Sequence, residues 1–310
     1  MKKNRIYSLV ALLSLFAAVS SCDDEAYDVT GNPNELIYFS ANQNQTFSVI
    51  STPEGYMGDK VEAKLGLRIT RPLGGNATVA AVVDNDLVAT YNAAHNTDYK
   101  VFPGSVDVKA ASFTSGSYQS ADSIEVSLPS EQYSALGREG SYLLPVHLTE
   151  ATAGKVTVTD KATAYILVNV ERKDINTDVK KEDITGTLAS NRSSWSVISE
   201  EAITDWSKLF DDDKSSSVSF SSNNPTITID LKEVKTLTGI YMNSGSSYNR
   251  FSAEISFSED NANYTKAGNT KNLAEHYIQV YGLSVRYIRM KLSWGYYYGR
   301  PLGDFNVYTK

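Results

Sequence analysis

Apolar and polar residues alternate along this chain in many short runs, and this alternation limits the fold more than any other feature. The clearest example is residues 61–69, where Val, Ala, Leu, Leu and Ile occupy every second position and Glu, Lys, Gly and Arg stand between them. Successive side chains of a strand face opposite sides, so the run predicts a strand with one buried face. Similar runs separated by turn-forming residues predict an all-β protein built of sandwiches.

A charged stretch divides these runs into two groups. Residues 35–172 and residues 184–310 each contain enough predicted strands for one sandwich. Residues 173–183 are rich in Lys, Asp and Glu and poor in apolar side chains, so we expect them to be a linker. One helix is expected near residues 87–94, where apolar residues recur at helical spacing.

The first residues read as an export signal rather than as part of a fold. Lys2, Lys3 and Arg5 precede an apolar run at residues 9–19 that is too short to span a bilayer and is typical of a signal peptide. Cys22 follows, and because it is the only cysteine it excludes an intramolecular disulfide and a cysteine-based zinc site. We expect residues 1–21 to be removed and residues 22–34 to form a flexible tether.

Residues 19–22 (VSSC) resemble the lipobox of bacterial lipoproteins. The resemblance implies cleavage before Cys22 and a lipid on its sulfur, and an ordinary signal peptide is the alternative. Residues 23–25 (DDE) are similar to the signal that sends lipoproteins of Bacteroidetes to the outer face of the outer membrane; a solvated tether is the alternative. The location implied is a lipid-anchored protein of the outer membrane, exposed on the cell surface.

The charges and motifs argue against two functional classes. The chain has 29 Lys and Arg against 36 Asp and Glu, a net charge of −7, and no basic block. Because nucleic-acid binding needs clustered Lys and Arg, we expect no nucleic-acid partner. The three histidines show no metal or catalytic spacing, and there is no serine nucleophile elbow, phosphate-binding glycine loop or zinc-protease motif. Two sandwiches use up the chain, so we do not expect an enzyme.

The first half resembles a known domain family of unknown function. Residues 91–99 (YNAAHNTDY), Pro103 and residues 141–146 (SYLLPV) carry the resemblance, which covers about residues 35–172. The family stands at the N-terminus of many surface lipoproteins of Bacteroidetes. Its members are similar to immunoglobulin-like sandwiches and usually precede a glycan-related module. The resemblance therefore implies a spacer position rather than a chemistry.

The second half resembles the coagulation-factor type C, or discoidin, family. Five segments match in the expected order: residues 209–218 (LFDDDKSSSV), 227–231 (ITIDL), 258–264 (SEDNANY), 285–290 (VRYIRM) and 305–308 (FNVY). Asp212 stands where the family has glycine, and Val218 stands where it has tryptophan. The resemblance implies a galactose-binding-like jelly-roll sandwich over residues 184–310 and a carbohydrate-binding module.

The same resemblance implies one structural calcium ion. In the family, the acidic segment binds the ion with help from an acid near the C-terminus. Carried over to this chain, the ligands are Asp211, Asp213, Ser216 and Asp304. Adjacent carboxylates suit a cation that prefers oxygen ligands, and a solvated acidic turn is the alternative.

Residues 294–300 (WGYYYGR) are the strongest candidate for ligand contact. Neighbouring residues of a strand face opposite sides, so one core cannot accept all three consecutive tyrosines, and some must be exposed. Aromatic rings stack on the C–H faces of sugars, and Arg and Asn side chains bond to their hydroxyls. In the resembled carbohydrate modules, this loop and the loop at residues 243–250 border the binding site. The expected glycan-binding set is Trp294, Tyr296, Tyr297, Tyr298, Arg250, Asn243, Tyr248 and Trp206. The alternative is that the aromatic side chains pack on the sandwich end or on the first domain.

Together these features predict a non-catalytic, surface-anchored lipoprotein that binds glycans for a polysaccharide-uptake system. The first domain would hold the second away from the membrane. The expected partners are an oligosaccharide or polysaccharide, outer-membrane lipid through Cys22, and an outer-membrane transporter complex. The alternative is an adhesin or assembly subunit whose aromatic loop docks a protein, because an exposed aromatic patch serves either purpose.

Overall fold

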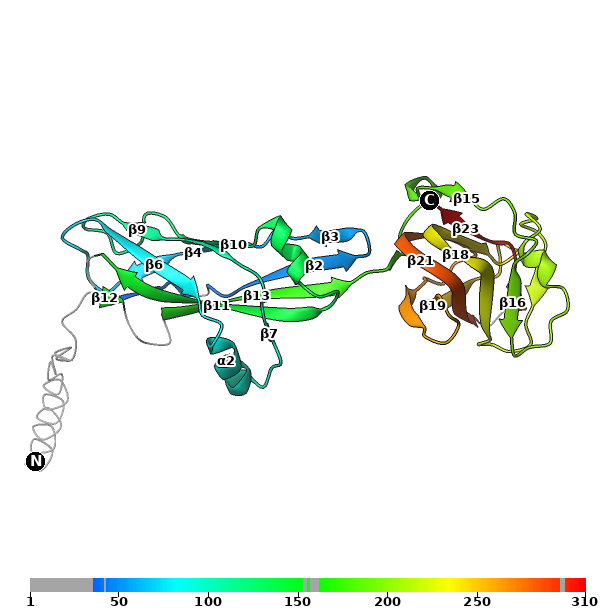
Figure 1. Cartoon of the computed structure of the whole chain (residues 1–310), viewed down its shortest axis with the longest axis horizontal. Coiled ribbons are helices and arrows are strands. Elements are labelled where there is room, and N and C mark those ends of the chain that lie inside the picture. Colours follow the sequence, from blue (N-terminus) through cyan, green and yellow to red (C-terminus); the bar gives the residue numbers. More distant parts are fainter. Residues whose placement is uncertain (1–35, 42, 153–154, 157–161, 296–298) are drawn as a thin grey trace, which may run out of the picture.

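The computed structural model describes residues 36–41, 43–152, 155–156, 162–295 and 299–310. They form two β-sandwiches, one after the other along the long axis of the molecule (Figure 1). Within the described residues there is one α-helix, α2 (Leu87–His95), and no helix there is long and apolar enough to span a bilayer. The all-β class and the helix expected near residues 87–94 are confirmed.

The first sandwich holds a large sheet in the order β3-β2-β13-β11-β6-β9, in which β2 runs parallel to β13. Two smaller sheets, β4-β10-β8 and β12-β1-β5, complete it. Every second residue of β13 from Ala164 to Val170 is buried, as expected for a strand with one face on the core. The strands are β1 (Leu36–Phe39), β2 (Gln45–Thr52), β3 (Gly55–Gly58), β4 (Glu62–Leu65), β5 (Leu67–Ile69), β6 (Ala77–Val83), β7 (Lys100–Val101), β8 (Asp107–Lys109), β9 (Ala111–Phe113), β10 (Ile124–Ser127), β11 (Gly140–Ala151), β12 (Lys155–Val156) and β13 (Thr163–Arg172).

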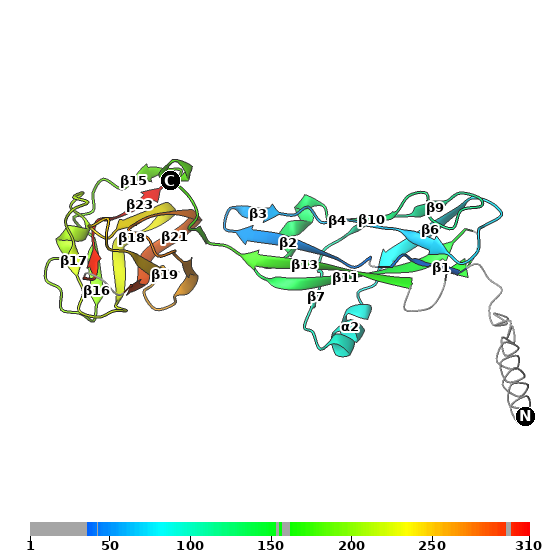
Figure 2. The same cartoon turned by 180° about the vertical axis from the view of Figure 1, so that it is seen from behind.

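The second sandwich is built around two long antiparallel strands, β18 and β21, which both layers share (Figure 2). The start of β18 pairs with β16 and its end pairs with β23, and register shifts near Asp230 and Leu237 separate the two parts. Such irregularities bend a strand, so one sheet closes over its own core as a jelly roll. The strands are β14 (Ile175–Asn176), β15 (Thr187–Leu188), β16 (Ser196–Ser199), β17 (Val218–Ser219), β18 (Thr226–Asn243), β19 (Phe251–Ser258), β20 (Thr265–Asn269), β21 (Glu275–Trp294), β22 (Pro301–Leu302) and β23 (Phe305–Thr309).

The start of the expected linker is part of the second sandwich. β14 pairs with β21, and Ile175 is buried in the second core. Asp174 is also buried, and its carboxylate accepts hydrogen bonds from Arg138 at 2.6 Å and from Arg172 at 2.7 Å. The backbone carbonyl of Asp174 accepts from the N–H of Tyr281 at 3.1 Å. The chain is therefore tied to both sandwiches at the point where it passes between them.

Candidate functional site

A hollow at one end of the second sandwich brings three loops together. It has a volume of about 150 Å³. The β18–β19 loop, the β20–β21 loop and the loop after β21 all contribute to it. The described residues that line it are Tyr248, Asn249, Arg250, Asn272, Trp294, Gly295 and Gly299.

Tyr248 is the most exposed large aromatic side chain of the described residues, at 89%. It stands in the β18–β19 loop, where Gly245 has φ +67° and lies so close to Ser217 that an added Cβ would come within 2.8 Å of it. This close packing holds the base of the loop, while Tyr248 and Arg250 extend into solvent. Arg250 forms no ion pair with any residue that the structure describes, so its hydrogen-bond donors are free for a ligand.

Trp294 lines the hollow with only a small part of its ring. It is the last residue of β21 and is 8% exposed. Its ring centre lies 5.3 Å from that of Phe220 and 6.0 Å from that of Phe251, and its Nε1 donates to the carbonyl of Pro301 at 3.2 Å. Trp294 therefore anchors the floor of the hollow in the core and does not form the open stacking platform expected from the sequence.

Two other residues of the expected set have supporting positions. Asn243 is buried; its Nδ2 donates to the hydroxyl of Tyr241 at 2.8 Å and its Oδ1 accepts from the N–H of Gly245 at 2.7 Å. It shapes the β18–β19 loop from below. Trp206 begins the short 3₁₀ helix η4 (Trp206–Leu209) and packs on Phe220 with ring centres 6.0 Å apart, outside the lining of the hollow.

The remaining expected glycan contacts, Tyr296, Tyr297 and Tyr298, lie outside the described residues. The structure adds Asn249 and Asn272, which the expected set did not contain. Asn249 stands between Tyr248 and Arg250, which belong to the expected set, so its polar side chain could have been identified from the sequence. Asn272 lies in a loop far from the others in sequence, and only the folded sheet brings it to the hollow.

His276 lies beneath this end of the sandwich. Its ring is buried against Phe251, with ring centres 4.6 Å apart, and Nε2 bonds to the carbonyl of Phe251 at 3.1 Å. Burial lowers the pKa of His276, and the carbonyl of Phe251 offsets part of that shift. The neutral form, with Nε2–H as the donor, therefore supports the strand that leads into the hollow.

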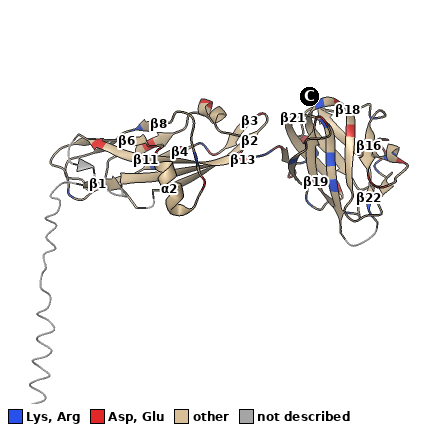
Figure 3. Ribbon diagram, turned by 60° about the horizontal axis from the view of Figure 1, so that its bottom comes forward, with Lys and Arg blue, Asp and Glu red and all other residues tan. Residues whose placement is uncertain are grey.

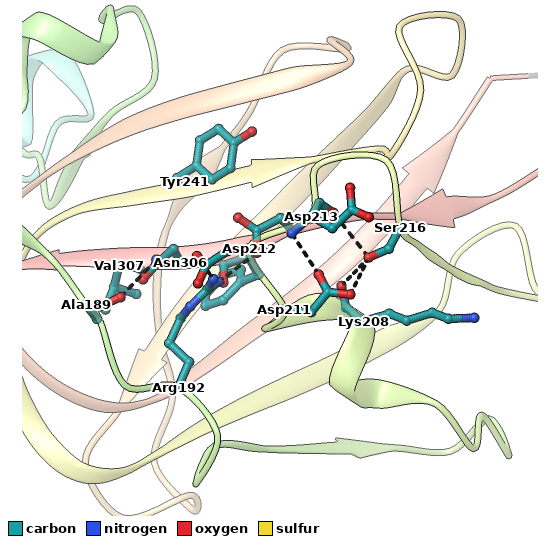
Figure 4. A network of polar contacts seen from close by, with 12 residues as sticks. Ala189, Arg192, Lys208, Asp211, Asp212, Asp213, Ser216, Tyr241, Asn306 and Val307 are labelled. Atoms are coloured by element: carbon teal, nitrogen blue, oxygen red, sulfur yellow. Dashed lines mark hydrogen bonds and ion pairs between the residues drawn. The ribbon is translucent and has the colours of Figure 1, made fainter.

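The acidic segment is a tight turn in which the carboxylates of Asp211 and Asp213 bond to the segment itself (Figure 4). Asp211 accepts hydrogen bonds from the N–H of Asp213 at 3.0 Å and from Oγ of Ser216 at 2.8 Å. Asp213 accepts from Oγ and N–H of Ser215 at 2.6 and 2.9 Å, and these bonds lower its pKa. Asp212 has φ +62°, in the left-handed region that Asp tolerates better than most residues, which explains how it replaces the glycine of the resembled family.

Asp304, the fourth expected ligand, is bound to a buried guanidinium. The side chain of Arg192 is 1% exposed, and its Nη1 donates to Oδ1 of Asp304 at 2.7 Å and to the carbonyl of Phe305 at 2.5 Å. Its Nη2 donates to Asp212 of the acidic turn. Burial raises the pKa of Asp304, and Arg192 opposes that shift. The chain itself thus supplies the positive charge between the turn and β23.

These residues do not fit a calcium site. Calcium takes about six to eight oxygen ligands, but both carboxylate oxygens of Asp211 and Oδ1 of Asp213 bond to donors of their own turn, and Oδ1 of Asp304 bonds to Arg192. Over the described part of the chain, no group of three or more His, Cys, Asp or Glu side chains is placed to hold a metal ion. The acidic segment is therefore a structural brace in this chain.

Two family models match the chain, one in each sandwich. A family model described as an F5/8 type C domain matches residues 187–300, and one described only as "-like, N-terminal domain" matches residues 31–155. No curated protein matches the chain.

Several solved structures are similar. A two-domain protein of unknown function from Bacteroides fragilis is 15% identical, with 92% of this chain and 98% of that chain covered and a TM-score of 0.45. The CpGH89CBM32-4 domain of Clostridium perfringens, in complex with GlcNAc-α-1,4-galactose, is 13% identical; 41% of this chain and 99% of that chain are covered, with a TM-score of 0.33. The C-terminal domain of a chitobiase from Bacteroides fragilis is 16% identical, with 40% and 98% covered and a TM-score of 0.34.

Proposed function

We propose that the protein, whose residues 187–300 match the F5/8 type C domain model, binds glycans, without cleaving them, through the hollow at the end of its second sandwich. The observation that carries the proposal is the position of Tyr248, exposed beside Arg250, Asn249 and Asn272 at that hollow. A sugar offers a C–H face to the ring and hydroxyl oxygens to the amide and guanidinium donors.

The chemistry of the lining supports binding rather than catalysis. Most glycoside hydrolases need two carboxyl groups on either side of the scissile bond. No Asp or Glu is found among the described residues that line the hollow. The residues present can orient and hold a sugar, and they include no general acid for a leaving group.

A glycan array on the parent protein, followed by titration calorimetry on variants, tests this proposal. We expect Tyr248→Ala to weaken binding of the best glycan by about tenfold or more, which corresponds to a loss of about 1.4 kcal/mol. Tyr118→Ala is the matched control, because Tyr118 is an exposed tyrosine of the first sandwich. If Tyr248→Ala and the parent bound every glycan with equal affinity, the hollow would not be the glycan-binding site.

The cellular setting is part of the proposal. We place the protein on the outer-membrane surface, anchored through Cys22, as a glycan-capturing subunit of a polysaccharide-uptake system that contains a transporter. The lipobox-like residues 19–22 support the anchor, and Cys22 itself lies outside the described residues. The order of the chain, an anchor followed by a spacer sandwich and then a binding sandwich, supports the capturing role.

Fractionation of cells that express Cys22→Ala tests the anchor. We expect the variant to leave the membrane fraction or to remain unprocessed. A variant that still sediments with membranes at the mature size would contradict the lipid attachment.

A further inference from the structure

The outer face of the sheet formed by β16, β18, β21, β19 and β20 carries a concentration of basic side chains, which we call the cationic face. Along β21, Ile288, Met290 and Leu292 are buried, so the residues between them point outward. Figure 3 shows Lys and Arg positions in blue on the strands of this domain. The cationic face consists of Lys232, Lys266, Arg286, Arg289 and Lys291.

Carboxylates neutralise only part of this charge. Asp230 accepts from Lys232 at 3.1 Å and from Arg286 at 3.0 Å, while Glu254 accepts from Lys266 at 2.5 Å. Neither Arg289 nor Lys291 forms an ion pair with a residue that the structure describes. Residues 184–310 contain 13 Lys and Arg and 13 Asp and Glu, so the face is a local excess in a domain without net charge.

Arg289 is held ready for an anion. Its guanidinium carbon lies 3.4 Å from the ring centre of Tyr264, whose hydroxyl donates to Asn261. Stacking on a ring fixes the plane of a guanidinium and leaves the N–H groups at its edge for an acceptor. Asp260, in the neighbouring hairpin, accepts from the N–H groups of Ala262 and Asn263 at 2.9 and 2.8 Å, so it is occupied within that turn.

Hydroxyl groups flank the two unpaired cations. Ser256 of β19 stands opposite Arg289, and Thr228 of β18, on its other side, is buried. Thr226 of β18 and Glu254 of β19 stand opposite Lys291 on its two sides. Arg289 and Lys291 are two residues apart on one strand, a spacing of about 6.8 Å. The face therefore offers two cations in line, Arg289 and, beside Glu254, Lys291, with the hydroxyls of Ser256 and Thr226 next to them.

We propose that the cationic face is a second binding surface, specific for a polysaccharide that carries carboxylate or sulfate groups. The Arg289 guanidinium matches a carboxylate or sulfate with paired hydrogen bonds, Lys291 attracts the next anionic group, and the flanking hydroxyls bond to the sugar. This surface is separate from the loop hollow and goes beyond the binding proposed there. Phe251 pairs with Trp294 and Ser252 with Ser293, so the two surfaces lie on one strand pair and a long chain can reach both.

Two other anionic partners fit the face less well. Nucleic acid binding relies on many phosphate contacts and on exposed rings for unpaired bases, whereas this face has two unpaired cations and its Tyr264 ring is covered by Arg289. A membrane surface requires a cluster of apolar side chains that enter the lipid, and the large exposed apolar residues described on these strands are Ile198 of β16 and Val234 of β18. The mixture of cations and hydroxyls favours an acidic sugar chain.

Affinity electrophoresis of the whole protein tests the proposal with polygalacturonate as the carboxylate probe, heparin as the sulfate probe and dextran as the neutral probe. We expect retardation by polygalacturonate, by heparin or by both, and none by dextran through this face. The double variant Arg289→Gln/Lys291→Gln should weaken the retardation about tenfold at about 50 mM salt and show a smaller loss at about 200 mM salt. The control Lys208→Gln/Lys271→Gln removes two basic residues elsewhere in the domain and should stay within about twofold of the parent.

Further measurements identify the class of partner and distinguish binding at the cationic face from binding at the loop hollow. Unchanged retardation of the Arg289→Gln/Lys291→Gln variant, or no retardation by either anionic probe, would overturn the cationic face. Tighter binding to single-stranded DNA or to phosphatidylglycerol vesicles than to both acidic polysaccharides would also overturn it, because the partner would then be of another class. The Tyr248→Ala variant should keep the parent's affinity for polygalacturonate fragments that are too short to span both surfaces. This measurement therefore tests the cationic face independently of whether the loop hollow binds glycan.

Discussion

The acidic segment and the loop hollow are both loops at the end of the second sandwich, and they differ in where their polar groups are directed. In the acidic segment, Asp211 and Asp213 bond to their own turn, and Arg192 joins Asp212 to Asp304. At the hollow, Tyr248 and Arg250 project into solvent. The resemblance marked both regions as binding sites. Residue type alone therefore does not identify a binding site. A polar side chain that already bonds to groups of the protein stabilises the fold, whereas one without such partners can bind a ligand.

The largest effect is expected at the brace. Arg192→Ala leaves Asp304 buried without its partner, and removal of one partner of a buried ion pair costs about 3–5 kcal/mol. Chemical unfolding should show this loss in the transition of the second sandwich. Asp212→Asn is the control, because Asp212 is 71% exposed and its pairing contributes about 1 kcal/mol or less. Equal stability of Arg192→Ala and the parent would contradict the brace.

A calcium titration tests whether the acidic segment binds a metal ion. Because Arg192 supplies the cation, thermal unfolding of the parent should give one midpoint with chelator and with added calcium. A ligand that binds only the native state would raise the midpoint by mass action. A clear rise with calcium would mean that the acidic turn opens to hold the ion.

The variants Trp294→Ala and Tyr248→Ala distinguish the buried floor of the hollow from its exposed rim. Because its ring packs on Phe220 and Phe251, its loss should cost about 3–5 kcal/mol and lower the thermal midpoint. The Tyr248→Ala change should cost about 0.5 kcal/mol or less, since its side chain is exposed. Differential scanning calorimetry on both variants measures the contrast, and similar midpoints would place Trp294 on the surface.

A smaller effect is expected from pH at His276. Burial lowers its pKa in the folded protein, so the unfolded chain takes up a proton near pH 6.5 while the folded chain resists it. Stability should therefore fall as the pH drops through about 6.5 toward the folded pKa, with a slope of at most about 1.4 kcal/mol per pH unit. His276→Gln should remove this part of the pH dependence. An unchanged profile in that variant would show that another group titrates.

Much of the fold could be predicted from the sequence, because alternation reports which face of a strand is buried. Applied along β21, the same rule also places Trp294 inward: Ile288, Met290 and Leu292 are buried, and Trp294 is the next member of that series. Trp294 lines the hollow, as expected, but as part of its floor, because the register of the strand directs its ring inward.

Other features could not be predicted from local pattern. Arg192 stands 112 residues before Asp304, and no spacing rule links a lone arginine to an acid that far away. Asn272 reaches the hollow through the pairing of β19 with β20 and β21, which is a property of the folded sheet. Similarly, Ile175 is one of two apolar residues in the charged stretch at residues 173–183, and its burial follows from the edge of β21 that it covers.

The central claim is that the loop hollow binds glycan, and an NMR titration of the second sandwich with the best array glycan, recorded within the whole protein, tests it most directly. The account predicts that the largest amide shifts fall on Tyr248, Asn249, Arg250, Asn272 and Gly295, with small shifts on the acidic turn at residues 211–216. Saturable shifts confined to the first sandwich or to the acidic turn, with the hollow unchanged, would contradict it.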